Sequence, residues 1–353
     1  MLKSLDMLHS KSMDTNKWVI MFYNEETAII DNRGKVTILN SKLLPFDIYL
    51  EESDDFDSYL NNIVNFWAWC SSRILSLDRT YSKNILNSAC LNQCTTDKER
   101  ARIALLFRCV SLRDNYWVKE LDDNIHWEDI NLFDNSLGDI VDIALLGNNL
   151  TVTNKNIISK DLFTDGVKPK AWVRDSKSFL LYKEDLEYKE VVASMELLSL
   201  GFNVLCYSKS SYKGTNCSVC KCFTSKDINY ITAGKYLYKY SINEIIDKYS
   251  KEFYEMILCD YLIGNSDRHQ DNWGFLFNKD REIVGFAPVF DFDHAFKADI
   301  ESKCLPMYLI GRSMNQIGSA KEAAEYLKLD LNKLINLSNN QFIKDRLLLL
   351  TGG

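Results

Sequence analysis

The polar stretch Gly264-Asn265-Ser266-Asp267-Arg268-His269-Gln270-Asp271-Asn272 directly follows the apolar pair Leu262-Ile263. Asp, Asn and Gly also gather in ordinary turns, so a loop without chemistry is one interpretation of this segment. The spacing within it is more specific, because a carboxylate at Asp267 and an amide at Asn272 stand five residues apart. The segment therefore predicts a loop that holds one carboxylate and one amide at a fixed separation.

A second carboxylate follows at Asp291, nineteen residues beyond Asn272 and directly after the apolar run Val289-Phe290. The intervening runs 273–277 and 283–286 are rich in β-prone residues and predict a hairpin. Such a hairpin would bring Asn272 and Asp291 together around one metal ion.

Phosphoryl transfer needs these groups: a carboxylate that orients or deprotonates the acceptor hydroxyl, oxygen ligands for Mg²⁺, and a cation on the donor phosphates. The Asp267–Asn272 spacing equals that of the kinase loop H-R-D-x-x-x-x-N. We expect Asp267 to be the base, and Asn272 and Asp291 to bind the metal. Asp293 makes the later segment D-F-D, which alone would also suit a glycosyltransferase metal site, but nothing else indicates a sugar-nucleotide site. His269 taken alone is more typical of a hydrogen-bonded structural residue.

Composition indicates a globular protein of two or three folding units, with 46% hydrophobic and 26% charged residues. The net charge of −7 and the absence of a basic run argue against a direct nucleic-acid partner. An acidic run over 120–142 predicts a solvated surface or a docking site for a basic partner. Residues 1–18 show no signal peptide, and no segment is long and apolar enough for a membrane. We therefore expect a cytoplasmic protein whose cysteines are thiols.

Cys217, Cys220 and Cys222 resemble half of a zinc site, but no second half has a fitting spacing. Buried strand cysteines are the simpler interpretation.

The order of predicted elements is β-rich, then helical, and then β-rich and helical again. Strands are expected at 19–23, 27–30, 36–39, 171–174, 178–183, 203–206 and 217–223, and helices at 59–77, 95–110, 186–200 and over much of the chain from 241 onward.

The segment 262–272 resembles the catalytic loop L-I-G-x-x-D-x-H-x-x-N of the HipA-like kinases, bacterial relatives of the serine/threonine kinases. Residues 287–291 resemble the metal-binding strand of that family. The resemblance covers about 162–296 and helical material beyond it. It implies an α+β, bilobal protein-kinase-like fold of the HipA type, with a small N-terminal α/β accessory domain. The implied parts are the accessory domain at 1–155, a kinase N-lobe at 156–240 and a C-lobe at 241–353.

The resemblance also implies roles for residues outside the catalytic loop. Lys183 would bind the donor phosphates and Glu190 would hold it, while His269 would support the loop or neighbour the phosphates. Gly166 and Lys170 would belong to a phosphate loop, although Val167, Lys168 and Pro169 depart from its usual G-x-Q-x-K. The implied adenine hinge is Lys221, Cys222 and Phe223, and the implied autophosphorylation site is Thr164.

These implications predict an ATP- and Mg²⁺-dependent phosphotransferase that acts on Ser or Thr of a protein substrate, and on itself. Phosphatidylinositol kinases share a D-R-H-x-x-N loop, so a small-molecule or phosphoinositide-type kinase is an alternative. A nucleotide-binding regulatory module without transfer activity is another. The resemblance also raises a regulatory or antitoxin partner, as in a toxin–antitoxin system.

Overall fold

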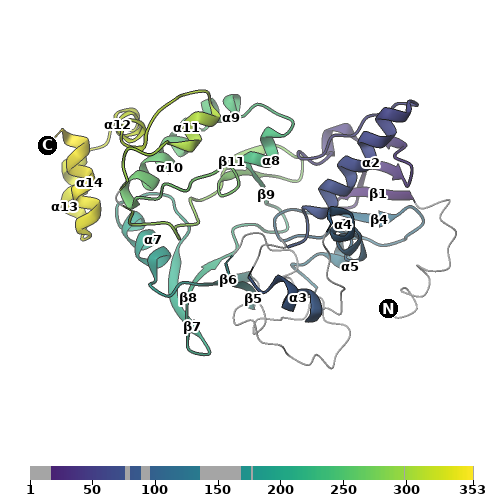
Figure 1. The fold of residues 1–353 in the computed structure, drawn as a ribbon, viewed down its shortest axis with the longest axis horizontal. Coiled ribbons are helices and arrows are strands. Elements are labelled where there is room, and N and C mark those ends of the chain that lie inside the picture. The colour runs from purple at the N-terminus through teal and green to yellow at the C-terminus, as the bar shows by residue number, and fades with distance from the viewer. Residues whose placement is uncertain are drawn as a thin grey trace. The chain divides into compact units, whose positions relative to one another are not determined.

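The computed structural model describes residues 17–75, 80–88, 96–135, 168–175, 178–297 and 299–352. The chain divides into two compact units, one made of Met1–Lys177, Thr224–Asn229 and Lys279–Arg281, the other of Ser178–Phe223, Tyr230–Asn278 and Glu282–Gly353. Both units combine helices with a sheet (Figure 1), which confirms the predicted α+β class.

A four-stranded antiparallel sheet forms the centre of the first unit, with the strand order β3-β2-β1-β4. Its apolar residues pack inward, and Val19, Ile20, Phe22 and Trp117 are fully buried. The three strands predicted before residue 40 are confirmed. The strands are β1 (Lys17–Phe22), β2 (Glu25–Asp31), β3 (Val36–Ile38) and β4 (Tyr116–Glu120).

Helices α2 and α4 of this unit begin at the polar caps Asp55 and Thr96, whose side chains accept from backbone N–H groups of the first turn. Thr96 and Glu99 form a reciprocal capping box at the start of α4. That helix ends at Leu106 rather than at 110 as predicted, because Arg108 and Cys109 adopt positive φ. The remaining elements are η1 (Ser41–Leu43), α2 (Phe56–Ser71), α3 (Ser82–Ser88), α4 (Asp97–Leu106), α5 (Trp127–Ile130) and β5 (Lys170–Asp175).

Strands β6, β8 and β7 lie side by side in that order in the second unit, and α7 packs against β7. Lys213 and Gly214 form the two-residue turn between β7 and β8, both with positive φ. The prediction of a strand at 203–206 is wrong, because this segment forms only one isolated bridge, between Val204 and Val289. The bounds are β6 (Ser178–Glu184), α7 (Lys189–Ser199), β7 (Tyr207–Tyr212) and β8 (Thr215–Lys221).

The rest of the second unit is mainly helical, as predicted, and is built around the buried helix α10. Helices α12 and α14 both pack on α10. A small sheet has the order β11-β10-β9. Its β10–β11 hairpin follows the segment 264–272 and confirms the hairpin predicted from the sequence. The elements are β9 (Asn229–Thr232), α8 (Ala233–Leu237), α9 (Asn243–Lys248), α10 (Ser250–Ile263), β10 (Gly274–Phe277), β11 (Ile283–Phe286), α11 (Leu305–Leu309), α12 (Gln316–Tyr326), α13 (Leu331–Leu337) and α14 (Gln341–Thr351).

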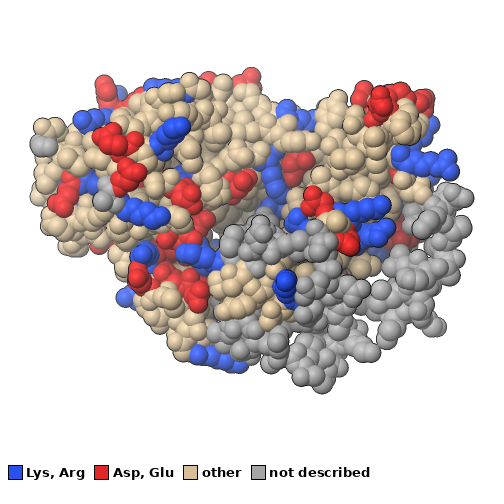
Figure 2. Space-filling model, viewed as in Figure 1, with Lys and Arg blue, Asp and Glu red and all other residues tan. Residues whose placement is uncertain are grey.

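The surface of the second unit carries both signs of charge. On the face drawn in Figure 2, its Lys and Arg side chains are interspersed with Asp and Glu. Among the described residues, no helix has the length and apolar character that crossing a membrane requires.

Candidate functional site

The predicted catalytic loop begins where α10 ends. Gly264 is the C-terminal cap of α10 and has φ of 67°, a left-handed conformation that favours glycine. A Cβ built on Gly264 would stand 2.3 Å from the backbone oxygen of Lys297. The helix therefore stops at a tightly enclosed point, and the chain leaves it as the loop that leads to β10.

Arg268 anchors this loop from inside, a role that no pattern in the sequence indicates. Its guanidinium is 1% exposed and donates to both carboxylate oxygens of Asp260, at 2.8 and 2.7 Å. It also donates to the backbone oxygens of Asn272, at 2.7 Å, and Phe290, at 2.6 Å. Burial alone would lower the pKa of Arg268, but Asp260 raises it above the ordinary value. One charged side chain thus joins α10, the loop and the segment before Asp291.

Asp267 and Asn272 lie close together in the loop. The Asn272 amide nitrogen donates to the backbone oxygen of Asp267 at 2.7 Å. The other amide atom of Asn272, Oδ1, is buried and has no hydrogen-bond partner within the described chain. The carboxylate of Asp267 is half exposed and lies 3.7 Å from Nε2 of His294. The loop therefore presents an accessible carboxylate beside an unsatisfied oxygen.

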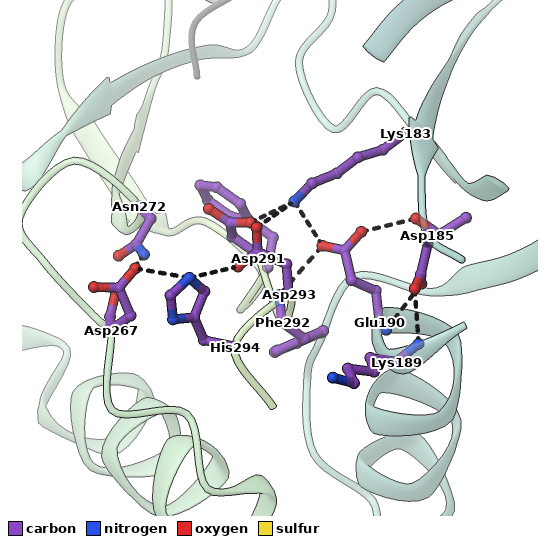
Figure 3. A network of polar contacts seen from close by, with 12 residues as sticks. Lys183, Asp185, Lys189, Glu190, Asp267, Asn272, Asp291, Phe292, Asp293 and His294 are labelled. Carbon is purple, nitrogen blue, oxygen red and sulfur yellow. Dashed lines mark hydrogen bonds and ion pairs between the residues drawn. The ribbon is translucent and has the colours of Figure 1, made fainter. Parts of the chain in front are cut away.

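Lys183, on β6, extends its ammonium into a cluster of carboxylates (Figure 3). Its Nζ lies 2.6 Å from Asp291, 3.0 Å from Glu190 and 3.5 Å from Asp293. The side chain is only 8% exposed. Burial by itself would lower the pKa of Lys183, but the surrounding carboxylates hold it well above its usual value. The lysine is therefore a fixed cation at this point.

Glu190, near the start of α7, is held on more than one side. Its carboxylate accepts hydrogen bonds from the Ser218 hydroxyl at 2.7 Å and from the Phe292 backbone N–H at 3.3 Å. Burial raises the pKa of Glu190, which Lys183 partly offsets. Asp185 accepts from the backbone N–H groups of Lys189 and Glu190, which explains why α7 begins at 189 and not at 186 as predicted.

Asp291 has an unusual backbone, with φ of 63°. A non-glycine residue in this left-handed region stores strain, which is common at functional sites. Its backbone N–H donates to the Tyr207 hydroxyl at 3.3 Å, and the preceding Val289 bridges to Val204. These contacts fix the direction in which the Asp291 carboxylate points.

The side chains of Asn272 and Asp291 offer the kind of oxygen ligands that a hard divalent cation binds together with a nucleotide. Among the described residues, no group of three or more His, Cys, Asp or Glu side chains could hold a metal ion. Mg²⁺ commonly uses one or two carboxylates together with substrate phosphates. The orphaned Oδ1 of Asn272 and the carboxylate of Asp291 are oxygen donors of the required kind.

The other residues predicted for the site make contacts with different neighbours. Lys221 ends β8, and the backbone N–H of Cys222 donates to Phe179 at 2.8 Å, while Phe223 packs against the rings of Tyr230 and Phe290. The ring of His269 is exposed, and its Nδ1 accepts from the backbone N–H of Asp271. Lys170 begins β5 in the first unit. Gly166 and Thr164 lie outside the described residues.

The structure also adds residues that the sequence interpretation did not assign. They are Asp260, Arg268, Ser218, Tyr207, Asp293 and His294. Only Asp293 had a signal in the sequence, because it belongs to the D-F-D segment.

Comparisons with known proteins find similarity to kinases. A family model described as phosphatidylinositol 3- and 4-kinase matches residues 136–310, just under half of the chain. The serine/threonine-protein kinase CtkA of Helicobacter pylori is 46% identical over 39 residues, which is 11% of this chain and 12% of that protein. The chain thus matches only about an eighth of the length of this curated relative.

Two solved structures are similar. HipA of Shewanella oneidensis, solved with HipB and operator DNA, has a TM-score of 0.50 at 12% identity over 95% of this chain and 96% of HipA. The chain has a HipA-like kinase fold. The crystal structure of the Helicobacter pylori proinflammatory kinase CtkA has a TM-score of 0.39 at 20% identity, over 54% of this chain and 89% of that one. The likeness to HipA confirms the HipA-like fold predicted from the segment 262–272.

Proposed function

We propose that this HipA-like chain is an ATP- and Mg²⁺-dependent kinase that phosphorylates Ser or Thr of a protein substrate, and also itself. The observation that carries the proposal is the position of Lys183. Its ammonium lies 3.0 Å from Glu190 and 2.6 Å from Asp291, which is 108 residues away in the sequence. A lysine paired with a helix glutamate beside a metal-binding Asp is what phosphoryl transfer by a kinase requires.

Each residue then has a chemical task. Lys183 holds the donor phosphates, and Glu190 fixes the direction of its ammonium. Asp267 orients the acceptor hydroxyl and takes its proton, which suits a half-exposed carboxylate. Asn272 and Asp291 hold Mg²⁺, which when bound neutralises charge on the phosphates. The backbone at Lys221, Cys222 and Phe223 receives adenine. The family resemblance supports phosphate-binding roles for Gly166, Lys170 and His269, and a role for Thr164 as the acceptor in the self-reaction.

The test is incubation of the purified chain with labelled ATP and Mg²⁺, followed by mass spectrometry of the chain and of proteins in a bacterial lysate. Asp267→Asn should lower transfer by about 10²–10⁴-fold, the usual contribution of a general base. Asp271→Asn is the matched control, because it removes an exposed carboxylate from the same loop. Undiminished transfer by folded Asp267→Asn would contradict the proposal.

A phosphoinositide-type kinase is the second candidate, and the family model that matches 136–310 favours it. Phosphatidylinositol vesicles in the same assay separate the two candidates, since label would then appear in lipid. Nucleotide binding without transfer to any acceptor would instead support a regulatory module.

The cellular setting is part of the proposal. HipA of Shewanella oneidensis was solved with HipB and operator DNA. We infer that this chain is cytoplasmic and has a regulatory, antitoxin-like partner, and that it does not itself contact nucleic acid. Co-purification of the native protein from its own cells, with and without nuclease treatment, tests the partner and the absence of nucleic-acid contact.

A further inference from the structure

Asp293 is a second carboxylate beside Lys183, and the proposed mechanism leaves it without a task. It follows Asp291 by two residues, and both carboxylates approach the same Nζ, at 3.5 and 2.6 Å. The Asp293 side chain is 18% exposed, so it is neither sealed in the core nor free in solvent. In Figure 3, Asp291 and Asp293 lie between Asp267 and Asn272 on one side and Lys183 and Glu190 on the other.

Three carboxylates, those of Glu190, Asp291 and Asp293, lie around the one ammonium of Lys183. Nε2 of His294 also lies 3.8 Å from the Asp293 carboxylate. A nucleotide triphosphate would bring more negative charge, and Lys183 would have to serve its phosphates as well. Negative charges packed this closely are stabilised by a cation, so a metal ion that enters with the nucleotide would suit this cluster.

Asn272 indicates where such a cation would find a further ligand. The residue is 5% exposed, and its Oδ1 is buried without a hydrogen-bond partner in the described chain. Its amide nitrogen donates to the Asp267 backbone oxygen, which leaves Oδ1 as the side-chain atom that could bind a cation. A buried amide oxygen without a partner costs free energy unless something binds it.

We infer that Asp293 is a metal ligand of this site, so that two carboxylates from the D-F-D segment, and not Asp291 alone, bind divalent cation together with Asn272. Two carboxylates and one amide oxygen, completed by phosphate oxygens, form a donor set that suits Mg²⁺ or Mn²⁺. Lys183 then exchanges its contact with Asp293 for a phosphate. This inference rests on the proposed function, because it assumes that the site binds a metal nucleotide.

The experiment measures Mn²⁺ binding by electron paramagnetic resonance, with a non-hydrolysable ATP analogue, for wild type, Asp293→Asn and the control Asp271→Asn. Asp293→Asn should weaken Mn²⁺ binding by at least about tenfold, a loss expected when metal-site residues are altered. Asp271→Asn should bind Mn²⁺ as the wild type does. Equal Mn²⁺ binding by Asp293→Asn and the wild type would overturn the inference.

A second variant separates ligation from ion pairing with Lys183. Asp293→Cys places a thiolate at the same position, and soft thiolate ligands favour Cd²⁺ over Mg²⁺. If residue 293 is a metal ligand, the ratio of Cd²⁺ affinity to Mn²⁺ affinity should be higher in this variant than in the wild type. An unchanged ratio contradicts ligation, even if Asp293→Asn does not fold.

The two proposals fail in different ways. If the wild type binds no Mn²⁺ with the analogue, the proposed kinase function fails, and the Asp293 inference fails with it. If the wild type binds Mn²⁺ and both Asp293 variants behave like it, only the inference fails.

Discussion

Arg268 and Asp260 form a buried, two-point ion pair, with Nε and Nη2 of the arginine 2.8 and 2.7 Å from the two carboxylate oxygens. The pair joins the catalytic loop to α10, because Arg268 lies in the loop and Asp260 in the last turns of the helix. The remaining guanidinium nitrogen reaches the backbone of Asn272 and Phe290. Both proposed metal-binding segments therefore depend on one side chain.

Arg268→Met should destabilise the chain by about 3–5 kcal/mol, because it leaves Asp260 buried without a countercharge. Urea unfolding at neutral pH measures the loss. The double variant Arg268→Met with Asp260→Leu should recover part of it, since the uncompensated charge is then gone. Lys35→Met is the control, because it breaks an exposed pair with Asp54 and should cause no measurable change. A single Arg268→Met variant as stable as the wild type would contradict the anchoring role.

Lys183→Met should lower kcat/KM for ATP by at least about 100-fold, the usual cost of removing one charge-stabilising donor. Glu190→Gln should cost less, because the amide keeps hydrogen-bonding atoms near Ser218 and Phe292 while the charge is lost. If Glu190 positions Lys183, the loss in Glu190→Gln should fall on KM for ATP as well as on kcat. Steady-state kinetics over a range of ATP concentrations give both values. Full activity in folded Lys183→Met would exclude the assigned role.

The loop 264–272 and the hairpin after it were largely predictable as structural elements, because their signals are local. The spacing of Asp267 and Asn272 and the alternating hairpin that follows are properties of a short segment, and the hairpin is present as β10 and β11. The contact between Lys183 and Glu190 was predicted from the resemblance to a family. A separation of seven residues in the sequence does not by itself indicate an ion pair.

The anchoring contacts were not predictable, because they depend on how distant backbone segments meet. Nothing in the sequence distinguishes Arg268 from a surface arginine before α10 and the segment of Phe290 enclose it. Strand β7 was missed since its sequence, Tyr207–Tyr212, is mostly polar and half exposed. The opposite error occurred at 203–206, where apolar residues form one bridge to Val289 and no strand.

Gly264→Ala should destabilise the second unit, because a left-handed φ of 67° costs an L-residue about 1–2 kcal/mol before any clash. The new Cβ would also stand 2.3 Å from the Lys297 backbone oxygen, so the catalytic loop must shift and transfer should fall. Gly285→Ala in β11 is the matched control, since its Cβ meets nothing within 4 Å. Thermal unfolding and the transfer assay are read together. Equal melting temperatures for the two variants would refute the prediction.

The first unit carries its own buried ion pair, between Arg73 and Asp114, with 2.7 Å between Nη2 and Oδ1. Burial would raise the pKa of Asp114, but the Arg73 guanidinium outweighs burial and holds it below the ordinary 3.8. A carboxylate with a depressed folded-state pKa contributes stability that is fully present above the unfolded-state value. That stability is lost as the pH falls through the folded-state value.

Asp114→Asn should therefore be much less stable than the wild type at pH 7, because Arg73 then lies buried without its countercharge. The difference in unfolding free energy should shrink as the pH falls below about 3.8, where the unfolded wild-type carboxyl takes up its proton. Urea unfolding of both proteins at several pH values between 3 and 7 measures this difference. Because the other carboxylates are common to both proteins, their titration cancels. A difference that stays constant over this range would show that the charge of Asp114 does not stabilise the fold.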